Sequence, residues 1–209
     1  MHYPTPPDPD FLAHVAERKA ALRTQLAALC PPGKPLTWEI GCGHGHFLVR
    51  YAASRPDELC IGIDLIRERI VRSEKKRDRA RLAHLHFIKC EAAEFLDCLP
   101  AETRLGSILV LFPDPWPKRR HHKNRLFQDS FLTTLAAKAG QGSRLYLRTD
   151  HADYFKAARE TIAAHAAWKI DPDAPWPLEE PTVFQQKAPS YQSLAALKTD
   201  SATPAGKSA

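Results

Sequence analysis

The chain has 209 residues, 44% of them hydrophobic, which suits one domain with a sizeable core. It carries 30 Lys and Arg residues against 24 Asp and Glu, and the net charge of +6 permits a polyanionic partner. Five cysteines form no CxxC pair and no metal-ligand spacing, which favours buried thiols in a reducing cytoplasm. An apolar run of about 18 residues and a basic-then-apolar leader are both absent, so neither a membrane span nor a signal peptide is predicted.

The two ends of the chain differ in composition from its middle. The first ten residues, MHYPTPPDPD, include four prolines, and the last ten, DSATPAGKSA, are mostly small and polar. We therefore expect flexible segments at 1–9 and 200–209, and a single domain over 10–199.

Hydrophobic periodicity predicts one long helix followed by alternating strands and helices. The helix covers about 11–29, with Asp10 as its cap, and Pro31, Pro32 and Gly33 end it. Short apolar runs predict strands at 36–40, 59–63, 84–89, 107–112 and 144–149. Helices are expected between them, near 46–54, 67–80, 91–98, 124–138 and 152–165. This alternation is typical of an α/β, Rossmann-like fold with a mostly parallel sheet and helices on both faces.

The last part of the chain has a different pattern. Prolines recur from 171 to 189, which predicts a long irregular loop, and such loops in compact domains are often functional. Residues 190–199 then predict a final antiparallel strand.

A glycine-rich loop follows the first predicted strand in WEIGCGHGHF. Gly41 and Gly43 allow a tight turn and let a ligand approach the backbone next to a helix start. Glu39 precedes the first glycine, where it would repel a pyrophosphate but attract the ammonium group of a methyl donor. His44 and His46 suggest a metal site only weakly, because no carboxylate or thiolate accompanies them, and we expect no metal.

Acids end three further strands. Asp64 lies about twenty residues past the glycines, where an acid typically pairs with a ribose diol, although it could instead cap the next helix. Glu91 could contact an adenine edge or begin the next helix. Asp150 could cap its helix or face the site opposite Asp114.

The segment 112–126, FPDPWPKRRHHKNRL, combines an acid on a rigid turn with a cationic strip. Pro113, Pro115 and Pro117 fix the backbone and keep Asp114 out of a helix, at the carboxyl end of a strand where open α/β sheets bind ligands. Five Lys and Arg residues follow from Lys118 to Arg125, a density that favours phosphate contact over a simple solvated face. The basic segment 67–81 either extends this strip or forms an exposed, mixed-charge helix.

This segment closely resembles the signature of the tRNA (guanine-N7)-methyltransferase family, and EIGCGHG, GID, RTD and TVFQ occur in that family's order. The resemblance covers about 36–199. It implies a seven-stranded class I methyltransferase sheet, S-adenosylmethionine as donor, and a guanosine in the variable loop of tRNA as acceptor. The donor-binding residues it implies are Glu39, Gly41, Gly43, Asp64, Glu91 and Asp114.

By the same resemblance Asp114 is the catalytic residue, and the substrate residues are Lys118, Asp150, Thr182 and Gln185. The implied RNA-binding residues are Arg119, Arg120, His121, His122, Lys123 and Arg125. The resemblance favours a monomer or weak homodimer, with no obligatory partner subunit.

Three positions depart from the family pattern. Asp64 and Glu91 each exchange one acid for the other, whereas Gln185 replaces the usual glutamate and loses a charge. Gln185 motivates one alternative, an RNA-binding relative with weak or no methyl transfer. The other alternative is an enzyme of the same fold that acts on a different substrate.

Overall fold

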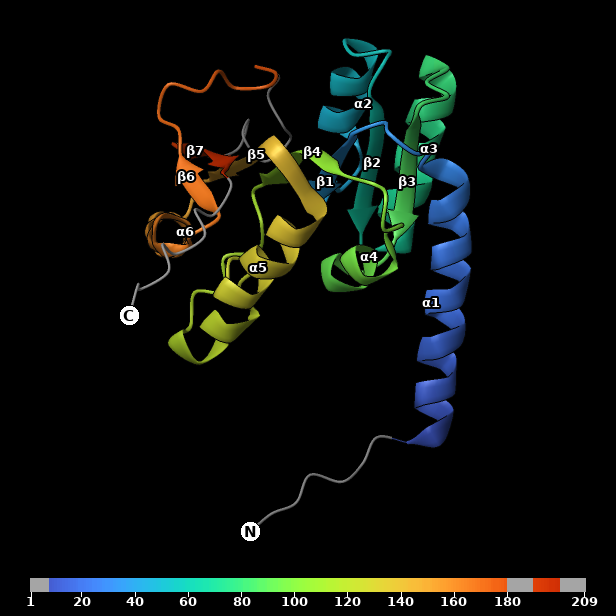
Figure 1. Cartoon of the computed structure of the whole chain (residues 1–209), viewed down its shortest axis with the longest axis horizontal. Helices are drawn as coiled ribbons and strands as arrows, with labels where there is room; N and C mark the ends of the chain where they lie inside the picture. The colour runs from blue at the N-terminus through green and yellow to red at the C-terminus, as the bar shows by residue number, and fades with distance from the viewer. Residues whose placement is uncertain (1–7, 180–189, 200–209) are drawn as a thin grey trace, which may run out of the picture.

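The computed structural model describes residues 8–179 and 190–199. Its centre is a seven-stranded sheet with the strand order β3-β2-β1-β4-β5-β7-β6 (Figure 1). The strands are β1 (Leu36–Ile40), β2 (Leu59–Asp64), β3 (Leu85–Lys89), β4 (Leu105–Leu111), β5 (Ala139–Thr149), β6 (Trp168–Ile170) and β7 (Gln192–Lys198). The first five strands are parallel, and β7 is antiparallel to both β5 and β6. The predicted α/β class and the antiparallel last strand are therefore confirmed.

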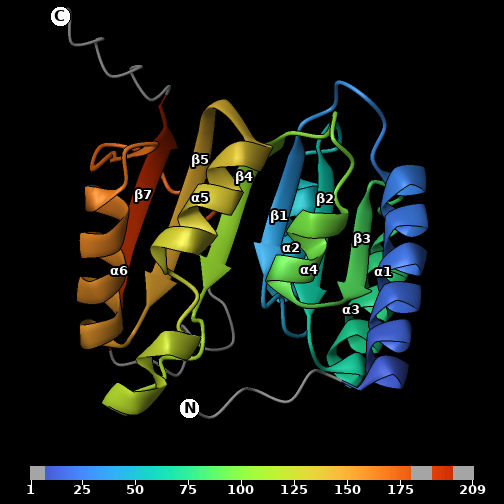
Figure 2. The same cartoon turned by 60° about the horizontal axis from the view of Figure 1, so that its bottom comes forward.

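Helices cover both faces of this sheet (Figure 2). They are α1 (Pro9–Leu29), α2 (His46–Ala53), α3 (Arg67–Ala80), α4 (Ala92–Cys98), the 3-10 helix η1 (Arg119–Asn124), α5 (Asp129–Lys138) and α6 (Ala152–Ala164). The helices α1, α4, α5 and α6 form one layer, and α2 and α3 form the other. Two helical layers around a parallel sheet bury the strands on both sides, as in β2, where every residue is buried.

A hydrophobic core lies on each face of the sheet. The larger core, on the side of α1, is built around Trp38, whose ring stacks on Phe95 with the centroids 4.6 Å apart. The smaller core, on the side of α2, contains Phe47 and Tyr51. All five cysteines are buried and unpaired, which agrees with the expectation of buried thiols. No helix within 8–179 or 190–199 is long and apolar enough to cross a membrane.

Several predicted boundaries were wrong. The cap of α1 is Asp8, not Asp10, because the Asp8 carboxylate accepts the Asp10 N–H at 3.0 Å. The helix predicted from 124 begins only at Asp129, since the backbone of Arg125 is extended. β5 begins five residues earlier than expected, and its pairing with β4 contains a register shift. The three-residue strand β6 was not predicted.

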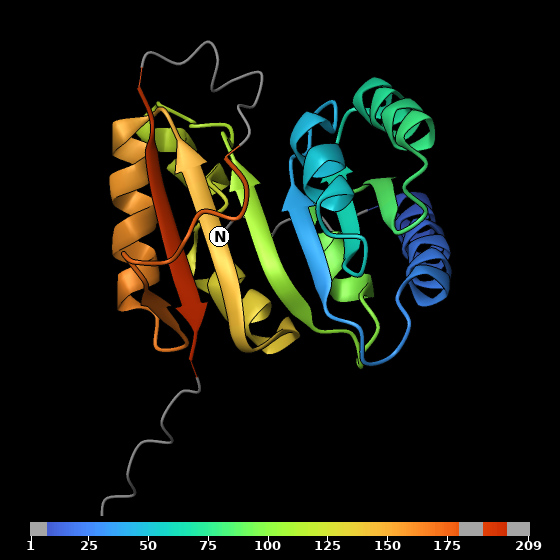
Figure 3. The ribbon, with the colours of Figure 1, turned by 90° about the horizontal axis from the view of Figure 1, so that it is seen from above.

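The described part of the Pro-rich stretch is irregular, as expected, and packs against the smaller core. After β6 the chain crosses over β7 and β5 on the face that carries α2 (Figure 3). Ala174, Trp176 and Leu178 of this stretch contact that core. The predicted domain limits stay a prediction, because 1–7 and 200–209 lie outside the described residues.

Candidate active site

The register of the parallel strands brings five loops together at one edge of the sheet. Ile40 at the end of β1 pairs with Ile63 of β2 and with Val110 of β4. On the far side of β4, Leu111 pairs with Arg148 of β5. The loops that carry the predicted acids therefore leave the sheet at the same edge, which is where open α/β sheets bind ligands.

The glycine loop after β1 leaves an open face. Gly41 and Gly43 have φ values of 73° and 54°, which favour glycine, and a Cβ added to either would meet no atom within 4 Å. Gly45 serves packing instead, because a Cβ there would lie 2.8 Å from the Phe87 ring and from Ser73. Two glycines are thus placed for ligand approach, and the third is required by the fold.

Glu39 lies buried in β1 directly before this loop and is only 3% exposed. Its Oε2 atom has no hydrogen-bond partner among the residues that the structure describes. Burial raises the pKa of Glu39 to about 8, and the nearby charge of Asp64 adds to the effect. A buried carboxyl with an unused oxygen is suited to a cationic or hydrogen-donating ligand group.

Asp64 at the end of β2 holds the glycine loop. Its carboxylate accepts hydrogen bonds from the N–H of Gly43 at 3.0 Å, the N–H of Ile66 at 2.8 Å and the guanidinium of Arg69 at 3.3 Å. The structure therefore shows Asp64 fixing both its own turn and the loop after β1. A carboxylate has about four acceptor sites, so one remains for a ligand hydroxyl.

Glu91 and Asp150 are both exposed, and neither side chain caps the helix that follows it. Glu91 occupies the cap position of α4 but makes no side-chain cap hydrogen bond. The cap of α6 is His151, whose Nδ1 accepts the N–H of Tyr154 at 3.2 Å. The capping alternative is therefore wrong for Asp150, and the side chain of Glu91 is not engaged as a cap.

The turn after β4 has a strained backbone that surrounding contacts hold in place. Phe112 and Trp116 have φ values of 51° and 44°, which non-glycine residues rarely adopt. The Phe112 N–H donates to the carbonyl of Arg148 at 2.7 Å, and the Trp116 ring packs edge to face with His121. Asp114, between them, is exposed at the strand-end edge.

The cationic strip divides into outward-facing and inward-facing residues. Lys118, Arg119, Arg120 and Lys123 are exposed, and His121 and His122 are half-buried. Arg125 is 6% exposed; its Nε donates to the Pro115 carbonyl at 3.0 Å and its guanidinium lies 5.2 Å from the centre of the Tyr154 ring. Burial therefore argues against the predicted RNA contact for Arg125, which holds the turn that carries Asp114. Thr182 and Gln185 lie outside the described residues.

His44 and His46 are surrounded by cations rather than by metal ligands. Lys76 donates to the His44 carbonyl at 2.7 Å, and Arg72 lies 3.5 Å from its Nε2. Burial lowers the pKa of both histidines, and nearby positive charge adds to the effect, from Arg72 and Lys76 for His44 and from Lys76 for His46. Within the described ranges no group of three or more His, Cys, Asp or Glu could hold a metal ion.

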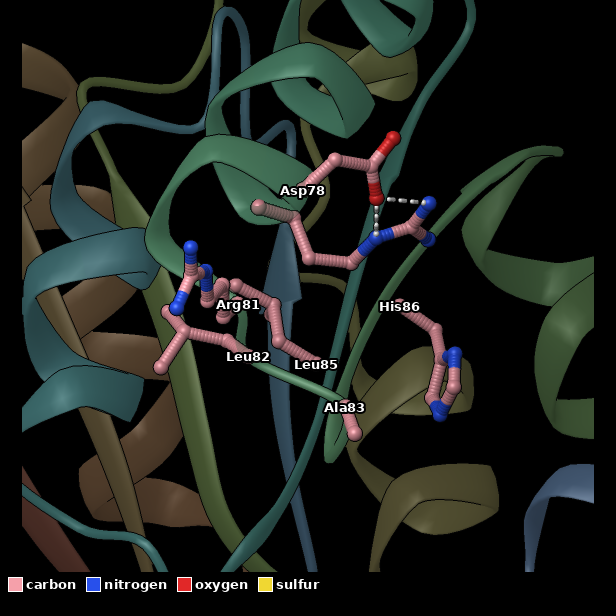
Figure 4. Close-up of a pocket in the computed structure, with 7 residues that line it drawn as sticks. Asp78, Arg81, Leu82, Ala83, Leu85 and His86 are labelled. Carbon is pink, nitrogen blue, oxygen red and sulfur yellow. Dashed lines mark hydrogen bonds and ion pairs between the residues drawn. The ribbon is translucent and has the colours of Figure 1, made fainter.

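Three surface cavities have volumes of 380, 350 and 320 Å³, and none of them is lined by a predicted site residue. The largest is formed where α3 ends and β3 begins, and Asp78, Arg81 and His86 are among its lining residues (Figure 4). In that cavity Asp78 is paired with Arg77 at 2.7 Å. None of the predicted site residues lines this largest cavity, so cavity volume alone does not locate the candidate active site.

One residue of this region was missed as a functional candidate. Arg148 is buried in β5, two positions before Asp150, directly after the apolar run Leu145–Leu147. A cation inside a buried strand is rarely left without partners, and that pattern in RLYLRTD was a usable signal.

Comparison with known proteins gives consistent matches. A family model described as "Putative methyltransferase" matches residues 33–200. The tRNA (guanine-N(7)-)-methyltransferase of Thermosynechococcus vestitus is 32% identical over 152 residues, which cover 70% of this chain and 71% of that protein. The protein of the same name from Treponema pallidum (strain Nichols) is 36% identical over 78% of this chain and 65% of its own length. The protein of that name from Thermus thermophilus is 34% identical over 66% of this chain and 44% of its own length.

Solved structures match in fold. A variant of the 16S rRNA (adenine(1408)-N(1))-methyltransferase from Catenulisporales acidiphilia, with its cosubstrate SAM, has a TM-score of 0.56 at 16% identity, over 96% of each chain. A precorrin-6y C5,15-methyltransferase from Geobacter metallireducens has a TM-score of 0.55 at 13% identity, over 87% of this chain and 88% of that one. The family model covers most of the chain, and the Thermosynechococcus relative is matched over more than two thirds of its length. The chain therefore belongs to the tRNA (guanine-N7)-methyltransferase family.

Proposed function

We propose that this protein transfers a methyl group from S-adenosylmethionine to N7 of a guanosine in tRNA, in the variable loop. The observation that carries the proposal is the segment 112–126. It leaves β4 at the same edge as the glycine loop, exposes Asp114 there, and continues directly into four exposed cations. An acid and a phosphate-binding strip next to a donor loop suit a methyltransferase that acts on a polyanion.

The described residues fit the donor. The open faces of Gly41 and Gly43 leave room for a ligand against the backbone, and the unused Oε2 of Glu39 is suited to its ammonium group. The remaining acceptor site of Asp64 and the exposed Glu91 are available for the ribose and the adenine edge. When bound, the donor supplies a methyl group on a positively charged sulfur.

The proposed chemistry needs positioning more than proton transfer. Guanine N7 has a lone pair and no proton, so it can attack the methyl carbon while the carbon–sulfur bond breaks and its electrons stay on sulfur. No general base is required, and in-line alignment can supply several kcal/mol of rate acceleration. We assign this alignment to Asp114, whose carboxylate also balances the positive charge that forms on the ring.

The exposed cations are assigned to the tRNA. Lys118 is the cation of this strip that is nearest to Asp114 in sequence and is assigned to the substrate, while Arg119, Arg120 and Lys123, along η1, are assigned to the phosphate backbone. Asp150, exposed after β5, is assigned to the guanosine together with Thr182 and Gln185. We further propose that the protein works in the cytoplasm, as a monomer or weak homodimer without a partner subunit.

The deciding experiment uses labelled S-adenosylmethionine and total tRNA, followed by nucleoside analysis. We expect the label in 7-methylguanosine, with none when the tRNA is replaced by ribosomal RNA or by protein substrates. Label in another nucleoside, or transfer only to protein, would overturn the proposal. Donor binding without any transfer would instead support a relative that has lost its activity.

A further inference from the structure

A row of like charges follows one face of α3. Arg72, Lys76 and Arg79 are spaced at i, i+4 and i+7, which places them on the same face of the helix, over about 10 Å of its length. Arg72 and Arg79 are exposed, and Lys76 is half-buried. By the same periodicity the acids Glu74 and Asp78 fall on a different face. We call the three cations the α3 row.

The α3 row lacks acidic partners. Elsewhere on this helix Arg69 pairs with Asp64 at 3.3 Å. None of the three cations of the row forms an ion pair with a residue that the structure describes, not even Arg72 with Glu68, one turn before it. Like charges at i, i+4 destabilise a helix by about 0.2–0.5 kcal/mol per pair. An anionic partner would offset this repulsion.

The row borders a surface cavity between α2 and α3, which lie side by side on one face of the sheet (Figure 3). The cavity has a volume of 350 Å³ and is lined by His46, Val49, Arg50, Lys76, Arg79 and Ala80. No Asp or Glu within 8–179 or 190–199 lines it. Burial lowers the pKa of Lys76, and the charges of Arg72 and Arg79 add to the effect. A cavity lined by cations without acids favours an anionic group.

The row also reaches the donor loop. Lys76 donates to the carbonyl of His44 at 2.7 Å, and His44 directly follows Gly43. An ammonium has three donors, so Lys76 keeps two for a ligand. In the sheet, β1 lies between β2, which leads into α3, and β4, which leads into the cationic strip that begins at Lys118. The donor loop after β1 therefore has a cationic surface on either side.

We infer that the α3 row and the cavity beside it form a second RNA-binding surface, which holds phosphates of the tRNA backbone on the β2 side of the donor loop. This inference rests on the proposed function. A row about 10 Å long can contact more than one phosphate of a strand, and the guanidinium groups of Arg72 and Arg79 suit phosphate oxygens. Phosphate contacts carry no sequence information, so this surface adds affinity and orientation rather than choice of base.

The test compares two double variants that remove the same charge. Arg72→Gln with Arg79→Gln removes the two exposed cations of the row. Lys156→Gln with Arg159→Gln is the matched control, because both residues are exposed on α6, in the other helical layer. Each double variant lowers the net charge from +6 to +4, so a general effect of charge is the same in both. Lys76 is kept, since it supports the donor loop.

We expect the row variant to bind tRNA about tenfold more weakly at ~0.1 M salt, as for the loss of about two phosphate contacts. The slope of log K against log salt should fall by about 1.5. The control should keep the unmodified affinity and slope. In steady-state kinetics the row variant should raise KM for tRNA and keep kcat, because the row does not touch the reacting atoms. Its donor affinity and melting temperature should stay unchanged.

Three outcomes would overturn the inference. The first is equal tRNA affinity in the two double variants. The second is a melting temperature that falls together with affinity in the row variant, which would give the row a structural role. The third is unchanged tRNA affinity with lost binding to phosphatidylserine vesicles, which would assign the surface to a membrane. If the unmodified protein bound tRNA without methylating it, the proposed function would fail, and the two affinities would still decide whether the row binds RNA.

Discussion

The Asp64 carboxylate accepts the Gly43 N–H at 3.0 Å, so the end of β2 fixes the loop that follows β1. This one hydrogen bond joins two adjacent strand ends across the sheet. The hydrogen bond holds the glycine loop in place within the protein, and donor binding should therefore require little reorganisation of the backbone.

Gly43→Ala separates the backbone requirement of this loop from its role toward the ligand. Gly43 has a φ of 54°, and a residue with a Cβ in this conformation should lower the stability by about 1–2 kcal/mol. The added methyl group would contact no protein atom, because none lies within 4 Å of its position. We expect donor affinity to fall by about tenfold or more, or about 1.4 kcal/mol, since the methyl occupies the ligand-facing side. Isothermal titration with S-adenosylmethionine measures this.

Gly33→Ala is the matched control. Gly33 also has a positive φ, 79°, and open space around its Cβ, but it lies in the loop between α1 and β1 at the opposite edge of the sheet. Its stability loss should equal that of Gly43→Ala, with donor affinity kept. Equal affinities in the two variants would remove Gly43 from the donor site.

Glu39 makes the stability of the free protein depend on pH. Its pKa is about 8 in the folded protein against 4.5 ordinarily, so the folded state holds a proton that the unfolded state releases. The contribution of Glu39 is fully present below about pH 4.5 and is lost as pH rises toward about 8. Urea unfolding between these values should show this decline, and Glu39→Gln should reduce it. An identical pH dependence in the Gln variant would contradict the raised pKa.

Donor binding near neutral pH should release a proton. Because Glu39 is protonated in the free protein and meets an ammonium group in the proposed complex, its pKa should fall when the donor binds. Calorimetry in two buffers with different ionisation enthalpies measures the protons released. We expect release in the unmodified protein and none in Glu39→Gln; release that persists in the variant would assign the proton to another group.

Asp114→Asn should lower kcat by about 10²–10³-fold, the range for loss of one electrostatic contact to a transition state. Asp114 is exposed, so melting temperature should stay the same. Asp57→Asn provides the control, because Asp57 is also exposed and lies in the turn before β2, at the other edge of the sheet. Full activity in Asp114→Asn would exclude Asp114 from the reaction.

Arg119→Ala should affect tRNA binding and Arg125→Ala should affect stability, although the two residues are only six positions apart. Arg119 is exposed, so its loss should weaken tRNA binding and lower the salt dependence of log K by about one phosphate contact. Arg125 is buried, and losing its charged hydrogen bond to the Pro115 carbonyl should cost about 1.5–3 kcal/mol of stability. Filter binding against salt and thermal unfolding distinguish the two. A salt-independent affinity would argue against an RNA substrate.

The sequence was informative where the signal is local. Short, mainly apolar runs identified β1, β2 and β3. The signal is clearest for β2, in which every residue is buried, because a parallel strand covered on both sides has no polar face to break the run. Prolines predicted the turn around Asp114, since they restrict the backbone by themselves. β6 is three residues long, too short for any periodicity, and forms through its pairing with β7.

Long-range contacts were not predictable in the same way. The burial of Arg125 depends on Tyr154, which is 29 positions later in the chain, and the setting of Arg148 depends on Trp176 and Tyr191. Nothing in the run KRRHHKNR distinguishes its buried arginine from its exposed ones. The composition of the strip was therefore predictable from sequence, while the direction of each side chain required the fold.

The left-handed backbone of Phe112 and Trp116 has a consequence for transplanting this segment. Its shape is held in part by residues outside the segment: the Arg148 carbonyl accepts the Phe112 N–H, and the Tyr154 ring packs against Arg125. A synthetic peptide of residues 112–126 should relax to other conformations in solution. If residues 112–126 were grafted onto the end of a strand in an unrelated protein, they would keep their amino-acid sequence but not this backbone conformation.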